Sequence, residues 1–323
     1  MTAPRRQPLS LRISVTDRCQ LRCVHCMPPD GVAKLPHEDI LTFEEILYFV
    51  RVAKARFDLF KVHVTGGEPL VRANVVRLIR MLAAEGIPDL VLTTNGQDLA
   101  GKANALRRAG LRRINVSLPS LDEKTYAALT RGGALRRTLR GIAGAQAAGL
   151  APVKLNAVIF RGWNDGEIER LAAFALESGC TIRFLELMPI GCARALAADR
   201  FVPAAEIRRR IEGAFALTPL AYEPGRSSRD FMAEDRHGRR GVVGFVSSET
   251  EPFCVGCARL RLTSTGEVVQ CLARGAGLPV RDLLRRPSPS AERALVKALE
   301  SLLVQKCARE SFSTARPMVA VGG

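Results

Sequence analysis

Short apolar runs typical of strands alternate with amphipathic helix patterns over residues 11–187. Each gap between strands leaves room for one or two helices, and strands joined by helical crossovers lie parallel in one sheet. Because these six strand–helix units are fewer than the eight of a closed barrel, we expect an α/β fold built on a partial, open (β/α)6 barrel. The predicted strands are residues 11–16, 59–65, 90–94, 113–117, 153–159 and 181–187.

The helices between these strands carry recognisable end signals. Thr42 and Glu45 have the spacing of a capping box, which predicts a helix from residue 43 to about residue 56. Glycines follow most of the later helices, as is common at helix C-termini. The later predicted helices are residues 74–85, 99–109, 122–148 and 165–178.

The alternation weakens after about residue 200. We therefore expect residues 1–200 to form the barrel and residues 201–323 to form a C-terminal α+β extension packed on it. Ser264-Thr265-Gly266 predicts a hairpin turn, and the polar, glycine-rich stretch at residues 223–241 predicts a long loop. The other elements predicted there are a helix at 204–213, strands at 242–247, 259–263 and 267–271, a helix at 291–304 and an irregular tail at 311–323.

The composition is that of a chain with a large core and a basic surface. Hydrophobic residues make up 47% of the 323 residues, and the formal net charge is +16. No apolar run approaches the roughly 20 residues that cross a bilayer, so we expect a cytoplasmic protein without a membrane partner. The arginines are scattered and aromatic residues are only 5%, which disfavours nucleic acid and leaves a solvated basic surface or an anionic substrate.

Cys19, Cys23 and Cys26 form a C-x3-C-x2-C loop directly after the first predicted strand. Nine cysteines in a cytoplasmic chain indicate metal binding rather than disulfides. Three thiolates can hold three corners of a four-iron cluster, and with no fourth cysteine nearby one iron keeps an open position. An open iron can bind and reduce a ligand, which favours an enzyme over an electron carrier.

A second group of three cysteines lies in the C-terminal extension. The spacing of this group is compatible with two kinds of site. One is a second iron–sulfur cluster, and the other is a Cys3His zinc site completed by His237. Arg259 and Arg261 follow on one strand and share a face, which suits phosphate or purine recognition or offsets thiolate charge. The second group is Cys254, Cys257 and Cys271, and the scattered Cys180, Cys192 and Cys307 are interpreted as buried or free thiols.

The remaining distinctive motifs also follow predicted strands. Parallel sheets bind ligands at the C-terminal ends of their strands, so motifs gathered there indicate a common site. Paired glycines would let a ligand approach the backbone closely. Besides the cysteine loop, the motifs are Thr65-Gly66-Gly67-Glu68-Pro69, Thr93-Thr94-Asn95-Gly96, Ser117-Leu118-Pro119-Ser120 and Met188-Pro189.

Several predicted strands contain one cation in an otherwise apolar run. Such a side chain either extends outward to solvent or points into the barrel, and spacing does not decide between them. If these cations point inward, they would suit a polyanion. They are Arg12, Lys61, Lys154 and Arg183.

These motifs resemble those of a known family. The C-x3-C-x2-C loop with Gly-Gly-Glu-Pro is similar to the radical S-adenosylmethionine (SAM) superfamily. The stretch Val15-Thr16-Asp17-Arg18-Cys19, the second cysteine group with its two arginines and the terminal Gly322-Gly323 resemble the GTP 3′,8-cyclase family of molybdenum cofactor biosynthesis. The resemblance covers nearly the whole chain.

The resemblance implies two [4Fe-4S] clusters, SAM as cofactor and GTP as substrate. In that family the N-terminal cluster reductively cleaves SAM, and the 5′-deoxyadenosyl radical takes hydrogen from C3′ of GTP. The C3′ radical then attacks C8 to give (8S)-3′,8-cyclo-7,8-dihydroguanosine 5′-triphosphate, the first step of molybdopterin biosynthesis, while the second cluster holds the purine. An electron donor and a downstream pyranopterin-forming enzyme are implied partners, and a homodimer is compatible with the sequence.

The resemblance also assigns residues by motif position. The cluster ligands would be Cys19, Cys23, Cys26, Cys254, Cys257 and Cys271. The SAM-binding residues would be His25, Gly67, Ser117 and Met188. The GTP-binding residues would be Arg12, His63, Thr94, Lys154, Arg259 and Arg261. Gly322 and Gly323 would form the tail that enters the active site and contributes to catalysis.

Three residues depart from the family's usual pattern. His25 replaces a tyrosine beside SAM, His63 replaces an arginine that faces GTP, and Pro119 replaces an aspartate. A mostly neutral histidine removes a fixed charge from a triphosphate contact. These departures favour, as an alternative, a related radical SAM enzyme with a different anionic substrate. A basic zinc-binding nucleic-acid protein is a remote third interpretation, because it leaves the strand-end motifs unexplained.

Overall fold

The computed structural model describes residues 6–223, 225–272, 277–304 and 314–320, and its strands form one twelve-stranded sheet. The order across the sheet is β12-β11-β10-β1-β2-β3-β4-β5-β6-β9-β8-β7. The strands are β1 (Pro8–Ser14), β2 (Asp58–Thr65), β3 (Asp89–Thr94), β4 (Arg113–Ser117), β5 (Val153–Val158), β6 (Thr181–Leu185), β7 (Ala216–Pro219), β8 (Arg229–Glu234), β9 (Arg240–Val246), β10 (Arg259–Leu262), β11 (Glu267–Val269) and β12 (Gly277–Pro279).

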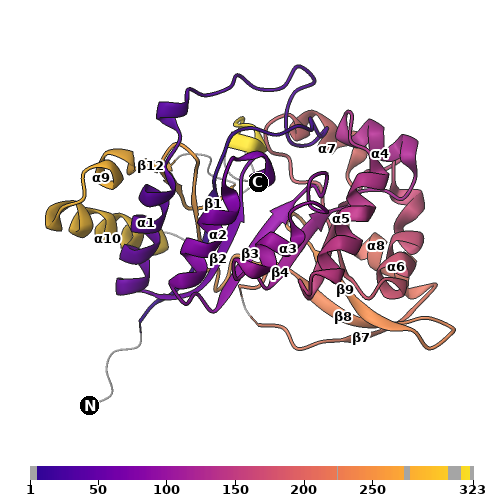
Figure 1. The fold of residues 1–323 in the computed structure, drawn as a ribbon. Helices are drawn as coiled ribbons and strands as arrows, with labels where there is room; N and C mark the ends of the chain where they lie inside the picture. The colour runs from indigo at the N-terminus through magenta and orange to yellow at the C-terminus, as the bar shows by residue number, and fades with distance from the viewer. Residues whose placement is uncertain (1–5, 224, 273–276, 305–313, 321–323) are drawn as a thin grey trace, which may run out of the picture.

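Helices follow the barrel strands as the sequence predicts, and they cover one side of the sheet (Figure 1). The helices are α1 (Phe43–Arg56), α2 (Val75–Ala84), α3 (Ala103–Arg108), α4 (Glu123–Thr130), α5 (Leu135–Ala147), α6 (Ile168–Glu177), α7 (Ala193–Arg200), α8 (Ala204–Glu212), α9 (Arg281–Arg285) and α10 (Pro289–Val304). Short 3-10 turns lie at His37–Asp39, Pro69–Val71, Asp165–Glu167 and Met318–Ala320.

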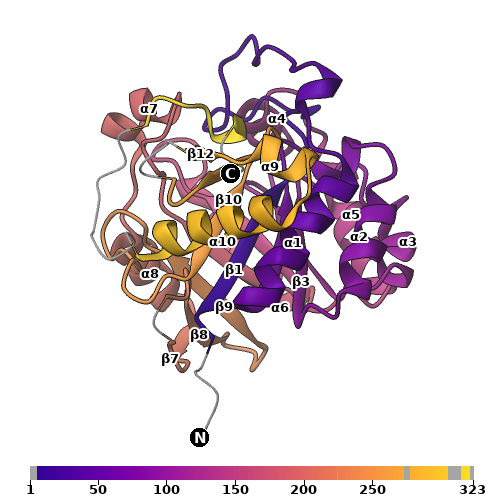
Figure 2. The ribbon, with the colours of Figure 1, turned by 90° about the vertical axis from the view of Figure 1, so that its left-hand side faces the viewer.

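The six predicted barrel strands β1–β6 lie side by side and pair in parallel. The C-terminal extension adds a parallel strand at each edge of this group, because β10 pairs with β1 and β9 pairs with β6. The predicted partial barrel is therefore confirmed. Its extension continues the same sheet, and α9 and α10 lie beside α1 (Figure 2).

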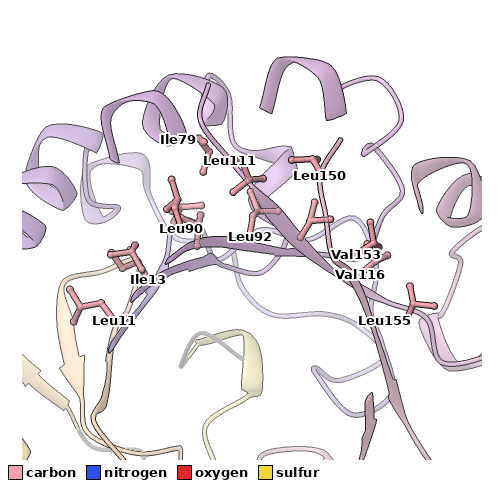
Figure 3. Close-up of a cluster of buried hydrophobic side chains, with 14 of the residues drawn as sticks. Leu11, Ile13, Ile79, Leu90, Leu92, Leu111, Val116, Leu150, Val153 and Leu155 are labelled. Carbon is pink, nitrogen blue, oxygen red and sulfur yellow. The ribbon is translucent and has the colours of Figure 1, made fainter. Parts of the chain in front are cut away.

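Alternating side chains give the two faces of the sheet opposite characters. Figure 3 shows Leu11, Ile13, Leu92, Val116 and Leu155 on the side that the helices cover, where all five belong to the main hydrophobic core. Successive residues of a strand point to opposite faces, so the residues between them face the inner side of the curved sheet. Burial of this apolar outer face against the helices supplies the main driving force for the fold.

Several local predictions are confirmed. The hydroxyl of Thr42 accepts a hydrogen bond from the Glu45 amide at 3.1 Å, and the Glu45 carboxylate accepts one from the Thr42 amide at 2.6 Å, which completes the capping box. Strands β10 and β11 form the predicted hairpin, with Gly266 at a φ of 81°. Among the described residues, no helix is long and apolar enough to span a bilayer.

The predicted long loop at residues 223–241 is wrong at residues 229–234 and 240–241, which lie in strands. Residues 229–234 form β8, which pairs antiparallel with β7 on one side and β9 on the other. The mixed polarity of this segment gives little strand signal by itself, and cross-sheet pairing decides its structure. Helices α7 and α9 were also not predicted. The predicted tail is described only at residues 314–320, where it includes a 3-10 turn.

Candidate active site

The first cysteine loop leaves the end of β1 and is held by the turn that leaves β2. Gly67 donates its amide hydrogen to the Thr16 carbonyl at 2.7 Å, and Glu68 donates its amide hydrogen to the Arg18 carbonyl at 2.8 Å. A Cβ atom at Gly67 would lie 2.3 Å from the Arg18 carbonyl oxygen. The glycine therefore allows the turn after β2 to contact the cysteine loop after β1 through backbone atoms alone.

The three thiols of this loop suit an iron–sulfur cluster. Burial raises the pKa of Cys19 to about 11 and that of Cys23 to about 12, and it raises the pKa of Cys26 well above its usual value. Thiols in such surroundings ionise when a metal supplies the compensating charge. A four-iron cluster spreads its ligands over separate irons, and within the described part of the chain no three Cys, His, Asp or Glu side chains form a site for a single ion.

An apolar cluster joins the first cysteine loop to three other segments. Ile190, Leu272 and Met318 are buried together, and Cys26 and Met188 pack against them. These residues come from the first loop, the segment after β6, the second cysteine group and the described end of the chain. Figure 1 shows the 318–320 turn at the same end of the sheet as the first loop. Gly322 and Gly323 lie outside the described residues.

His25 lies in the cysteine loop and packs against Phe160, with ring centroids 5.8 Å apart. Burial lowers the pKa of His25 to about 4, so the ring is uncharged at neutral pH. Its Nδ1 atom is buried and has no hydrogen-bond partner among the residues that the structure describes. A buried polar atom of this kind is a candidate contact for a ligand.

The Thr-Thr-Asn-Gly motif directs its two threonines to different places. Thr94 donates its hydroxyl hydrogen to the Glu68 carboxylate at 2.7 Å and accepts the Gly96 amide at 3.0 Å. Thr93 faces the inner side, where its hydroxyl lies 2.5 Å from the Nε2 atom of His63. The sequence analysis assigned Thr94 to the GTP site, and strand alternation places Thr93 rather than Thr94 on the inner face.

Glu68 is buried and connects the ends of β2 and β3. Besides Thr94, its carboxylate accepts the Asn95 amide at 2.7 Å and the Leu70 amide at 3.0 Å. Burial raises its pKa to about 7. Glu186 has a comparable position after β6: its carboxylate accepts the amides of Ala204 and Glu249, each at 2.8 Å. Neither carboxylate was assigned a role from the sequence, because burial and amide contacts leave no local signal.

The strand register places the cations of the barrel on the inner face. Their spacing in the sequence did not show whether they point into the barrel or outward to solvent. Arg12 is aligned with Arg261 of β10 and with His63 of β2, and neighbours in register share a face. Arg183 donates from Nε to the Asn156 side-chain oxygen at 3.0 Å. The inner-face basic residues are Arg12, Lys61, His63, Arg113, Lys154, Arg183, Arg259 and Arg261.

These basic groups are half-buried, with Arg261 buried, and several are close enough to repel one another. Burial, followed by the charge of Arg113, lowers the pKa of Lys61 to about 8. Burial, followed by the charge of Arg259, lowers the pKa of Arg261 to about 10. The pKa of Arg12 is lowered by burial and then by the charges of Arg261, Arg259 and Arg183. A bound polyanion would relieve this repulsion.

The described carboxylates near the inner face sit at its margins. Asp89 accepts from the Arg113 guanidinium at 2.7 Å and lies 3.4 Å from the Lys61 amine, at the start of β3. Asp230 lies across β9 from Arg183, where a Cβ atom on Gly244 would come within 2.4 Å of its carboxylate. The charge of Asp230 partly counters the lowering of the pKa of Arg183, which is about 10.

Asn115 and Ser117 lie on the inner face of β4. The Asn115 amide donates to the Thr93 hydroxyl at 3.2 Å, while its Oδ1 atom is buried without a hydrogen-bond partner among the described residues.

Ser117 is the last residue of β4 and is aligned with Asn156 on β5. Pro119 follows, and its carbonyl accepts a hydrogen bond from Asn164 at 2.7 Å.

The second cysteine group lies beside Arg261. The Cys257 amide donates to the Cys254 carbonyl at 3.1 Å, and the charges of Cys271 and Cys257 act to raise the pKa of Arg261. A Cβ on Gly225, which precedes β8, would lie 3.1 Å from the Cys257 nitrogen, whereas His237 lies in the turn that follows β8, and a six-residue strand spans about 20 Å. The Cys3His zinc site completed by His237 is therefore wrong, because the length of β8 separates the histidine from the thiols.

The scattered cysteines behave as predicted where they are described. Cys180 is buried in the main core, and Cys192 lies with its Sγ atom 3.5 Å from the Val24 carbonyl oxygen. Both are free thiols. Cys307 lies outside the described residues.

Substitution of Gly67 by alanine is expected to abolish iron incorporation at the first cysteine loop, because the new Cβ would overlap the Arg18 carbonyl. Iron content after anaerobic reconstitution measures this effect. Gly101→Ala is the matched control, since a Cβ at Gly101 meets no atom within 4 Å. Wild-type iron content in Gly67→Ala would contradict the close backbone contact.

Comparison with known proteins agrees with this arrangement. Residues 13–175 match the model of the radical SAM superfamily, and residues 180–312 match the model described as Molybdenum Cofactor Synthesis C. The fold resembles the crystal structure of Streptococcus suis SuiB bound to S-adenosylmethionine, with a TM-score of 0.61 at 17% identity, covering 86% of this chain and 65% of that one.

Curated relatives match along almost their whole length. The GTP 3′,8-cyclase of Pelotomaculum thermopropionicum is 42% identical, over 97% of this chain and 97% of the relative. The GTP 3′,8-cyclase of Moorella thermoacetica is 43% identical, over 98% of each. The two family models and these relatives together cover the residues of the described site. The chain therefore belongs to the GTP 3′,8-cyclase family of the radical SAM superfamily.

Proposed function

We propose that this chain converts GTP to 3′,8-cyclo-GTP, using SAM as the source of the radical. The observation that carries the proposal is the set of half-buried inner-face cations between two groups of three cysteines. A nucleoside triphosphate supplies the negative charge that these cations require, and guanidinium groups suit phosphate oxygens. The GTP 3′,8-cyclase relatives support GTP as the substrate.

At the first site, Cys19, Cys23 and Cys26 would hold a [4Fe-4S] cluster whose open iron binds SAM. When bound and reduced, the cluster supplies the electron that splits SAM into methionine and the 5′-deoxyadenosyl radical. The turn at Gly67 positions the cluster loop through its backbone hydrogen bonds. The SAM-binding residues of the proposal are His25, Gly67, Ser117 and Met188.

The triphosphate would lie against the inner-face cations. Arg12, Lys154, Arg259 and Arg261 keep their proposed roles, and Lys61 and Arg183 join them because they share this face. His63 would contribute a hydrogen bond rather than a charge, since burial and the neighbouring Arg12 hold its pKa well below the usual value. Thr93 replaces Thr94 as our preferred contact, because Thr93 lies on the inner face with these cations, whereas Thr94 is on the other face and is bonded to Glu68.

The second cysteine group would hold another [4Fe-4S] cluster that binds the purine. Arg261 beside Cys257 and Cys271 supports this assignment, because a cation stabilises a thiolate-rich centre. We further propose that residues 1–200 form the barrel that holds the first cluster and most of the triphosphate-binding cations, and that residues 201–323 form the extension that holds the second cluster. Gly322 and Gly323 would then enter the site from the segment 314–320, which contains the buried Met318.

This function requires partners and a reducing environment. A low-potential electron donor would reduce the first cluster, and a pyranopterin-forming enzyme would take the product. Thiolate-bound clusters persist where thiols stay reduced, which supports a cytoplasmic location.

The proposed function is tested with GTP deuterated at C3′. Reduced, reconstituted enzyme given SAM and this substrate is expected to form 3′,8-cyclo-GTP and 5′-deoxyadenosine that carries the deuterium, as measured by mass spectrometry. Formation of 5′-deoxyadenosine without a GTP-derived product would instead support a radical SAM enzyme with another anionic substrate, which the neutral His63 also favours.

Arg183→Met is expected to raise the KM for GTP about 10- to 100-fold, because it removes one charge-assisted hydrogen bond worth about 1.5–3 kcal/mol. SAM cleavage in the absence of GTP should keep its wild-type rate, as followed by 5′-deoxyadenosine. The matched control is Arg136→Met, whose guanidinium is exposed and paired with Glu123. An unchanged KM in Arg183→Met would exclude Arg183 from the triphosphate site.

Metal analysis tests the second cluster. Two four-iron clusters predict about eight irons per chain after anaerobic reconstitution, with matching sulfide. The triple substitution of Cys254, Cys257 and Cys271 by serine should retain about four. A wild-type content of about four irons and one zinc would overturn the second cluster while leaving the first in place.

A further inference from the structure

We propose that Asn95 sets the reduction potential of the first cluster by donating a hydrogen bond to the ligand sulfur of Cys19. Asn95 is a positioning residue in this inference, since it acts through a cluster ligand. The inference rests on the proposed function only in that Cys19 ligates the cluster, and it is independent of the substrate.

The Cys19 sulfur lies within reach of two N–H donors. The Asn95 side-chain amide donates from Nδ2 to Cys19 Sγ at 3.7 Å, and the Leu21 backbone amide donates to the same sulfur at 3.4 Å. The two donors therefore favour negative charge on this sulfur.

The orientation of the Asn95 side chain is fixed by its own loop. Its Oδ1 atom accepts the backbone amide of Gln97 at 3.0 Å, so the NH2 group must point the other way. That direction leads to the Cys19 sulfur and to the Gln20 side-chain oxygen, which is 3.3 Å from Nδ2. A reversed amide would lose the Gln97 bond and face the sulfur with an oxygen.

The backbone of Asn95 is held at both of its polar groups. Its amide donates to Glu68 at 2.7 Å, and its carbonyl accepts the Thr138 hydroxyl at 3.0 Å. Glu68 in turn is bonded through its own amide to the Arg18 carbonyl of the cysteine loop. The donor and the sulfur therefore belong to one rigid unit, and the Thr94 hydroxyl belongs to it as well through Glu68.

A hydrogen bond to a ligand sulfur acts on the oxidised and reduced clusters unequally. Reduction adds one electron, and part of the added negative charge resides on the sulfurs. An N–H donor stabilises the more negative, reduced form to a greater extent, which raises the reduction potential. The external one-electron donor then reduces the cluster more readily, and this reduction must precede SAM cleavage.

The experiment is a redox titration of the reconstituted full-length protein with dithionite, monitored by electron paramagnetic resonance. The first cluster is identified as the signal that changes when SAM is added. In Asn95→Ala the ratio of reduced to oxidised first cluster at a fixed potential should fall about 3- to 10-fold. This fall corresponds to a shift of about 28–59 mV to more negative potential for one electron. Asn95→Asp keeps the acceptor for Gln97 and should shift in the same direction.

Gln97→Ala is the matched control for a structural effect. The Gln97 side chain donates to the Thr138 hydroxyl at 2.8 Å and to the Ala134 carbonyl at 3.0 Å, within the same network as Asn95. It should lower the melting temperature and leave the potential unchanged. If the Asn95 variants lose iron or stability while the remaining first cluster keeps its wild-type potential, Asn95 is structural and the inference is overturned. A positive shift overturns it as well.

The titration contains no GTP, so its outcome is separate from that of the proposed function. A wild-type enzyme that fails to cyclise GTP can still show the predicted shift in Asn95→Ala. Conversely, an active cyclase with unshifted Asn95 variants would retain the function and lose this inference.

Discussion

The two-residue alternation of the parallel strands is the constraint on which the rest of the structure depends. It directs Leu11 and Ile13 into the core beneath the helices, and it directs Arg12 between them to the inner face. Burial of the apolar face supplies the stability that an inner face rich in cations does not. A shift of one residue in register would exchange the two faces, so the core and the site specify one register together.

The inner face has an electrostatic cost that its proposed ligand would offset. Arg12, Arg183 and Arg261 share a partly desolvated surface, and their pKa values are all lowered by burial. Such an arrangement is unfavourable without an anion, and the proposed triphosphate would make it favourable. Neutral His63 reduces the repulsion in the centre of this group, which gives its departure from the family pattern a physical reason.

At the rim, precision comes from backbone contacts and buried carboxylates. Gly67 brings the turn after β2 against the first cysteine loop, and Glu68 fastens that turn to Asn95 after β3. Glu186 fastens the end of β6 to the segment that leads to the second cysteine group. Each contact joins two segments that are distant in sequence and so holds one loop in place against another.

The sequence alone determined the strand–helix alternation, the capping box at Thr42 and the grouping of motifs at strand ends, because these depend on local periodicity and spacing. Only the tertiary structure placed β8 in the sheet, separated His237 from the second cysteine group and turned Lys154 inward. It also distinguished Thr93 from Thr94. Each of these outcomes depends on pairing or burial between distant segments, for which a single stretch of sequence carries little signal.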